Sequence, residues 1–170
     1  EARSPEGLWA LMSRLKGEGC EGLLLTGGCD SKGQVPLAPF AETLERLKRE
    51  LGLKTAIHTK FLDEPLAEAL GAADLDIAMI DVVGADETIQ AMFNMPDGST
   101  ANVLRSLDLG ESFGLPLAPH IVFGAHAGEL RGEYEALAML KGRKLRALVI
   151  VLLMRIGSKL APPPAPPDLQ

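Results

Sequence analysis

The segment Asp76–Val83 has the sequence DIAMIDVV, a short run that is apolar apart from its two aspartates. It lacks the alternation of apolar and polar residues that marks a strand with one solvated face. Such a run is typical of a strand buried on both faces, as in a parallel sheet that is covered by helices. Four further runs have the same character, namely Gly22–Thr26 (GLLLT), Lys54–Thr59 (KTAIHT), Ala118–Phe123 (APHIVF) and Ala147–Met154 (ALVIVLLM).

Segments with a helical pattern separate these runs, and successive strands start roughly 30 residues apart, the length of one strand–helix unit. The first helix is expected to follow Ser4, an N-cap residue before a proline, and to reach Gly17. Further helices are expected at Pro39–Leu51, Asp63–Gly71, Asp86–Phe93, Ala101–Phe113 and Glu129–Leu140.

This alternation predicts the α/β class and a partial TIM-type (β/α) barrel of about five parallel strands with intervening helices. A full barrel has eight strands in about 250 residues, and this chain has 170 residues. We expect residues 1–160 to form the barrel domain. Residues 161–170, which are rich in proline, are expected to form an extended tail.

Composition excludes several classes of function. The net charge is −6 and basic residues do not cluster, which argues against a nucleic-acid partner or an anionic membrane surface. The longest apolar run is strand-sized, so no membrane span is expected. The two cysteines and three scattered histidines lack the spacing of a metal site, so no metal ligand is predicted. Two cysteines also cannot make a disulfide framework, so a cytoplasmic location is the default. The open sheet edges favour association with a second copy or with a partner.

Reactive residues of parallel α/β folds lie at the carboxyl ends of the strands. After the first predicted strand comes Thr26-Gly27-Gly28, whose glycines either let a ligand approach the backbone or serve a turn that needs a positive φ. The segment matches neither G-x-G-x-x-G nor the P-loop. Cys29 is expected to be a small buried side chain rather than a reactive thiol.

His58 and Asp81 lie at the ends of two consecutive predicted strands, where both side chains could point over one mouth of the barrel. They could form a general acid/base pair, a pair that orients a ligand, or a hydrogen-bonded structural pair. His120 starts the fourth predicted strand, far from its reactive end, and is expected to be structural. His126 follows a glycine in a predicted loop and is expected to be an exposed bystander.

Several blocks of the chain, in order, resemble the core of radical S-adenosylmethionine (radical SAM) proteins of the biotin-synthase-like branch. The resemblance spans residues 4–160, and its five strands correspond to the second to sixth strands of that family. The blocks are LLLTGGCDSKGQVPL (23–37), AIHTKFLDE (56–64), IAMIDVVGADETI (77–89), PHIVFGAHAGELRGEYEAL (119–137) and ALVIVLLM (147–154).

The resemblance implies S-adenosylmethionine as cofactor and a small organic molecule as substrate. Thr26, Gly27 and Gly28 take the place of the family's glycine-rich turn, which holds the methionine amino group, with Cys29 where the family has an acidic residue. The residues that match the lining of the cofactor and substrate cavity are His58, Thr59 and Asp81. The pattern that packs on adenine in the family is matched by the stretch from Ile121 to Gly124.

The sequence also departs from the family. The C-x3-C-x2-C motif that holds a [4Fe–4S] cluster is absent, and Lys60 adds a charge where related sequences tend to be small. The resemblance therefore predicts that the cluster motif precedes Glu1 in a longer parent chain, and that this chain alone is inactive; no catalytic residue is assigned. Two alternatives remain open: a cluster-free binding or scaffold module with a nucleoside-like pocket, and another barrel enzyme that uses His58 and Asp81 for acid/base chemistry.

Overall fold

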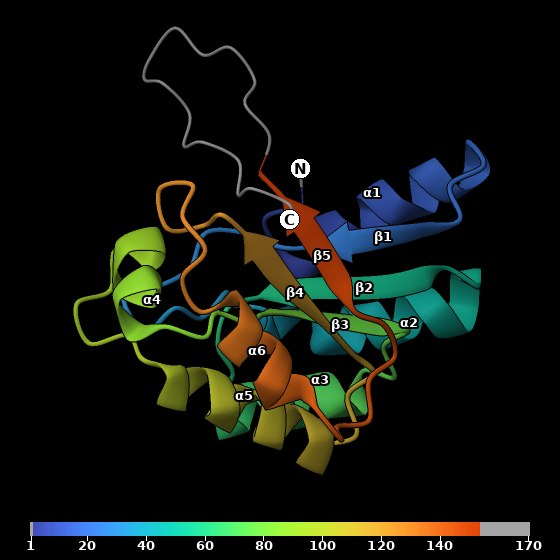
Figure 1. Ribbon diagram of the computed structural model, residues 1–170. Coiled ribbons are helices and arrows are strands. Elements are labelled where there is room, and N and C mark those ends of the chain that lie inside the picture. The colour runs from blue at the N-terminus through green and yellow to red at the C-terminus, as the bar shows by residue number, and fades with distance from the viewer. Residues whose placement is uncertain (1, 154–170) are drawn as a thin grey trace, which may run out of the picture.

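The computed structural model describes residues 2–153, which form five parallel strands that curl into a half-barrel (Figure 1). The strands pair in chain order, from β1 at one edge of the described sheet to β5 at the other. The fold class predicted from the sequence is confirmed. The strands are β1 (Gly22–Leu25), β2 (Lys54–Thr59), β3 (Ile77–Asp81), β4 (Leu117–Phe123) and β5 (Val149–Leu152).

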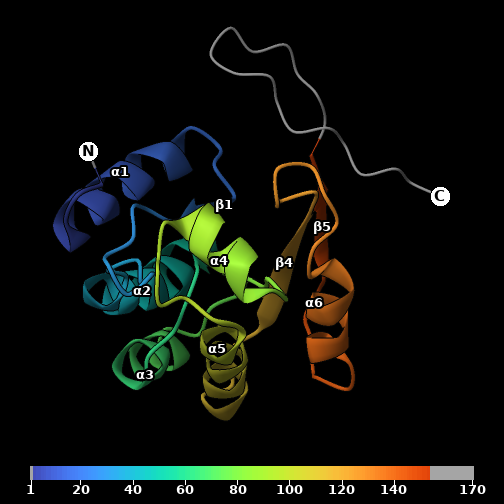
Figure 2. The same cartoon turned by 60° about the vertical axis from the view of Figure 1, so that its left-hand side comes forward.

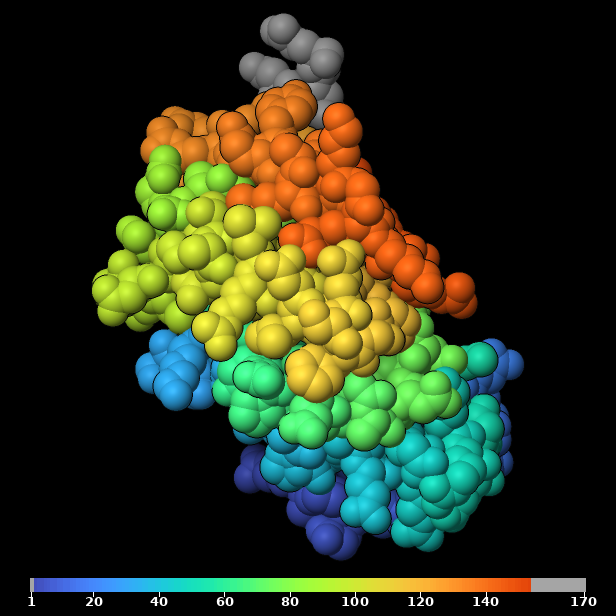
Figure 3. All heavy atoms as spheres, turned by 90° about the horizontal axis from the view of Figure 1, so that it is seen from below, coloured from blue at the N-terminus to red at the C-terminus, as the bar shows by residue number. Residues whose placement is uncertain are grey.

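Helices cover the convex face of the sheet (Figure 2). Seen from that side, the chain passes in order from blue and cyan through green to yellow and orange (Figure 3). Within residues 2–153, no helix combines the length and the apolar character needed to cross a lipid bilayer. The helices are α1 (Pro5–Gly17), η1 (Ala38–Phe40), α2 (Ala41–Leu51), α3 (Glu64–Ala72), α4 (Asp86–Phe93), α5 (Thr100–Ser112) and α6 (Glu133–Leu140).

The core lies between the helices and the convex face, because successive side chains of a strand point to opposite faces. In β2, Thr55 and Ile57 are fully buried, whereas the intervening Ala56 is only half-buried. The concave face of the half-barrel is much more open, as Leu24 of β1 shows with 50% of its surface exposed. The largest fully buried side chains belong to the helix layer and the convex face and include Leu44, Leu47, Leu70, Leu107, Ile57, Ile80 and Leu117.

Some element boundaries differ from the sequence prediction. The strand at Lys54–Thr59 and the helix at Asp86–Phe93 have the predicted bounds. Helix α6 begins at Glu133 instead of Glu129, because residues 124–132 form a loop in which His126 bridges Glu129 and Gly132 has a φ of 98°. The last strand is shorter than expected, and the predicted tail at residues 161–170 lies outside the described residues.

The two faces of the sheet predict different costs for the same truncation. Leu47→Ala in α2 removes a fully buried side chain, so we expect the free energy of unfolding to fall by about 2–5 kcal/mol. Leu24→Ala on the concave face removes a half-exposed side chain, so we expect a loss below about 1.5 kcal/mol. Denaturant unfolding of both variants measures the difference. Equal losses would contradict the assignment of the core to the convex side.

Candidate functional site

His58 and Asp81 meet on the concave face near the carboxyl ends of two neighbouring strands. His58 Nε2 lies 2.9 Å from Asp81 Oδ1. The His58 side chain is 29% exposed and that of Asp81 is 17% exposed, so the pair is partly shielded but accessible. The structure thus brings together the two residues that the sequence placed at one mouth of the barrel.

His120 joins this pair, which corrects the expectation that it lies far from the reactive end. It is the fourth residue of β4, and the strand register sets it beside Asp81, the last residue of β3. Its ring centroid lies 4.8 Å from that of His58. Its Nε2 atom is buried and has no hydrogen-bond partner among the described residues. The sequence interpretation considered only strand ends, and the stagger between β3 and β4 brings a mid-strand residue level with one of them.

The two imidazoles have opposite electrostatic tendencies. The hydrogen bond to Asp81 raises the pKa of His58 above its ordinary value, against the effect of burial and of the Lys60 charge. Burial and the neighbouring His58 charge lower the pKa of His120, against the attraction of Asp81. The site therefore combines one imidazole that favours its protonated form with one that favours its neutral form.

The loop that follows β1 lies beside the concave cluster of His58, Asp81 and His120, and we call this loop the rim. Thr26 Oγ1 donates to the His58 carbonyl over 3.1 Å, which ties the loop to β2. Neither Gly27 nor Gly28 has a positive φ, so a turn that requires one is not the reason for these glycines. A Cβ atom at Gly27 would make an ordinary contact with Val35 at 3.5 Å, and one at Gly28 would meet nothing within 4 Å. The described part of the chain thus leaves open space at Gly28.

Polar groups in the same loop have partners in the loop itself and in Lys60, which follows β2. Asp30 Oδ1 accepts the backbone N–H groups of Lys32 and Gln34, so this carboxylate shapes the loop. The half-buried Cys29 thiol accepts from Lys60 Nζ over 3.1 Å. The same ammonium lies 4.5 Å from the Phe93 ring centroid. The positive charge that departs from the family pattern is therefore held at the rim.

Two residues expected in the cofactor cavity face the other side of the sheet, since strand neighbours alternate in direction. Thr59 is 2% exposed, and its hydroxyl accepts from the Val35 N–H and donates to the Phe61 carbonyl. Ile121 is 1% exposed and belongs to the core. The structure does not bring these side chains together with His58 and Asp81.

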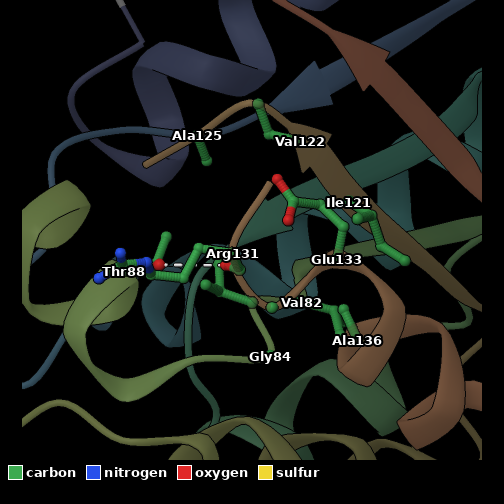
Figure 4. A pocket seen from close by; sticks show the side chains of 11 residues that line it. Val82, Gly84, Thr88, Ile121, Val122, Ala125, Arg131, Glu133 and Ala136 are labelled. Carbon is green, nitrogen blue, oxygen red and sulfur yellow. Dashed lines mark hydrogen bonds between the residues drawn. The ribbon is translucent and has the colours of Figure 1, made fainter. Parts of the chain in front are cut away.

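Glu133, which the sequence reasoning missed, holds the carboxyl end of β4. It is 4% exposed, and its Oε1 accepts the Gly124 N–H over 2.9 Å, while its Oε2 has no partner among the described residues. Glu133 lines a cavity of about 10 Å³, room for one water, together with Val82, Gly84, Thr88, Ile121, Val122 and Ala136 (Figure 4). Gly124 has a φ of 80°, which favours glycine there. Only the acidic start of the predicted helix could have drawn attention to Glu133.

His126 is not the exposed bystander that was expected. It is half-buried, and its Nδ1 lies 3.2 Å from Thr88 Oγ1. The Thr88 hydroxyl also donates to the Arg131 carbonyl, drawn as a dashed line in Figure 4. These contacts connect the loop after β4 to α4, and His126 takes no part in the concave cluster.

The cysteines do not fit a [4Fe–4S] cluster. Such a cluster takes three or four cysteine thiolates, and the whole sequence holds two cysteines. Cys20 precedes β1 and its thiol donates to the Gly22 carbonyl, whereas Cys29 follows the other end of the strand. No cluster chemistry is therefore assigned to this chain.

Comparison with known proteins finds likeness in structure alone. No protein-family model and no curated protein matches the chain. The solved structure of HydG, a maturase of the [FeFe]-hydrogenase, has a TM-score of 0.69 and 11% identity over 95% of this chain and 38% of its own. That of methylornithine synthase (PylB) has a TM-score of 0.62 and 16% identity over 86% of this chain and 43% of its own. At these low identities the structural likeness shows the fold alone, and the chain spans less than half of either protein.

The hydrogen bond between His58 and Asp81 can be tested by titration. Asp81→Asn removes the largest cause of the raised His58 pKa, so we expect that pKa to fall to or below its ordinary value of 6.5. The measurement is the NMR titration of the histidine ring protons in protein freed of metal ions by a chelator, with His126 as internal reference. An unchanged His58 pKa would contradict the observed geometry.

The same substitution makes a prediction about stability. A raised folded-state pKa contributes stability that is present below the unfolded pKa of 6.5 and is lost as the pH rises through the folded value. The lowered pKa of His120 acts in the opposite direction, and loss of the Asp81 charge lowers this pKa further, which adds to the cost at low pH. We therefore expect Asp81→Asn to cost more stability at about pH 5.5 than at about pH 8.5. Denaturant unfolding at the two pH values measures this difference.

The Glu133 carboxylate is predicted to hold the loop after β4. Glu133→Ala leaves the buried Gly124 N–H without its acceptor, so we expect a loss of about 1–3 kcal/mol in unfolding free energy. Glu133→Gln keeps a carbonyl oxygen for that bond and is the matched control. Hydrogen exchange of the Gly124 amide should accelerate in the alanine variant and remain slow in the glutamine variant.

Proposed function

We propose that this chain is the S-adenosylmethionine-binding part of a radical SAM enzyme, and that alone it binds this cofactor without cleaving it. The observation that carries the proposal is the Gly27-Gly28 pair at the carboxyl end of β1. Neither its φ angles nor the space around it requires glycine. A bound molecule that touches the backbone there gives these glycines a reason.

The architecture supports this proposal. HydG and PylB are radical SAM enzymes, and the structure of each matches most of the length of this chain. Their likeness to this chain is one of fold. The proposal of a cofactor site rests on that fold together with the open glycine loop and the sequence blocks that resemble the family.

The chemistry of the rim suits the amino-acid end of S-adenosylmethionine. Backbone carbonyls at Thr26 and Gly27 can accept from its ammonium group, as the resemblance implies, and the lack of a side chain at Gly28 lets the ligand approach. The Lys60 ammonium, held between Cys29 and Phe93, suits the carboxylate of the same ligand. The concave face beside the rim is available for a small organic substrate.

In this proposal the [4Fe–4S] cluster belongs to a part of the parent protein that this chain does not contain. Support comes from the shares of HydG and PylB that the chain spans, 38% and 43%, and from its two cysteines. A C-x3-C-x2-C motif in the parent reading frame is the expected finding. A parent without that motif would leave a cluster-free binding module, the second candidate that the cysteine count favours.

Calorimetry with S-adenosylmethionine tests binding by the chain itself. Gly28→Val fills the open space with a branched side chain, so we expect the affinity to fall at least about tenfold, equivalent to about 1.4 kcal/mol. Gly17→Val is the matched control, since a Cβ there also meets nothing within 4 Å but lies at the end of α1. The control variant should bind S-adenosylmethionine like the unsubstituted chain.

The result that contradicts the proposal is equally definite. If the folded, unsubstituted chain shows no binding at millimolar S-adenosylmethionine, it does not bind this cofactor on its own. If Gly28→Val and Gly17→Val bind equally well, the cofactor does not contact the loop after β1.

A further inference from the structure

We propose that His58, Asp81 and His120 bind one divalent transition-metal ion on the concave face of the half-barrel. The three residues come from three adjacent strands, β2, β3 and β4. One ligand atom from each can be chosen so that all three lie within 4.8 Å of one another. This site is independent of the proposed S-adenosylmethionine site, and its test uses metal ions alone.

The spacing of these atoms suits a shared ion. Ligand atoms that bind one transition metal at about 2.1 Å lie about 3–3.5 Å apart. His58 Nε2 and Asp81 Oδ1 are already 2.9 Å apart. All three ligand atoms lie within 4.8 Å of one another, so bringing the widest pair to about 3.5 Å takes a shift of at most about 1.3 Å.

The buried Nε2 of His120 is the observation that a simple hydrogen-bonded pair does not explain. His58 and Asp81 satisfy each other, but the pair leaves this nitrogen without a partner among the described residues. Buried polar atoms in folded proteins nearly always have one. A metal ion, or a water bound to it, supplies what the described side chains do not.

The donor set selects the class of ion. Two imidazoles and one carboxylate suit zinc and ferrous iron, whereas magnesium and calcium prefer oxygen ligands alone. Three protein ligands on one side leave positions open toward the concave face, where the cluster is only partly covered. The ligand class that completes the coordination is therefore a small molecule with an oxygen or nitrogen donor.

The experiment is a titration of the metal-free chain with Co²⁺, followed by its visible absorption, and then competition by Zn²⁺. We expect one equivalent to bind. His58→Ala, Asp81→Asn and His120→Ala should each weaken binding at least about tenfold. His126→Ala is the matched control, because it removes the one other histidine of the sequence. Cys29→Ser removes the thiol that Lys60 contacts at the rim. Both variants should bind Co²⁺ like the unsubstituted chain.

A second measurement avoids the variants altogether, in case one of them fails to fold. Bound Co²⁺ should shift or broaden the ring-proton resonances of His58 and His120 far more strongly than those of His126. Either of two results would overturn the proposal: no bound equivalent in the folded chain, or binding that depends on His126 or Cys29 and not on His120.

Discussion

Parallel pairing of the strands in chain order is the constraint on which the rest of the structure depends. Each connection between neighbouring strands crosses with the same hand, so helices accumulate on one face of the sheet. That face becomes the core, and the other face remains available for a site. The adjacent residues Ile57 and His58 show the consequence, because the first is fully buried and the second reaches the concave cluster. A register slip of one residue would exchange their roles.

The cluster itself depends on the stagger between strands. His58 pairs in register with Met79, two residues before Asp81, whereas Asp81 pairs with the middle of β4 at His120. Strand β4 therefore continues past the end of β3, and its central residue reaches the level of that end. Side chains that are far apart in the chain meet because three strands end at different heights.

These relations explain what the sequence could predict. The strands are local apolar runs, so β2 was placed at its true bounds, and the meeting of His58 with Asp81 followed from their positions at strand ends. His120 was misjudged because the level that a residue occupies depends on pairing with a distant strand. Thr59 matches the cavity lining by its motif, and its side chain lies on the core face, because a strand end contains residues of both faces and the motif match did not separate them.

The glycine loop and the concave cluster differ in how far they are exposed to solvent. The loop is exposed and has open space at Gly28, whereas the cluster contains a buried nitrogen and two partly covered side chains. The Thr26 hydroxyl connects them, since it donates to the carbonyl of the residue that carries the cluster's first imidazole. This bond ends on the His58 backbone, so it fixes the loop against β2 and leaves the His58 side chain to pair with Asp81.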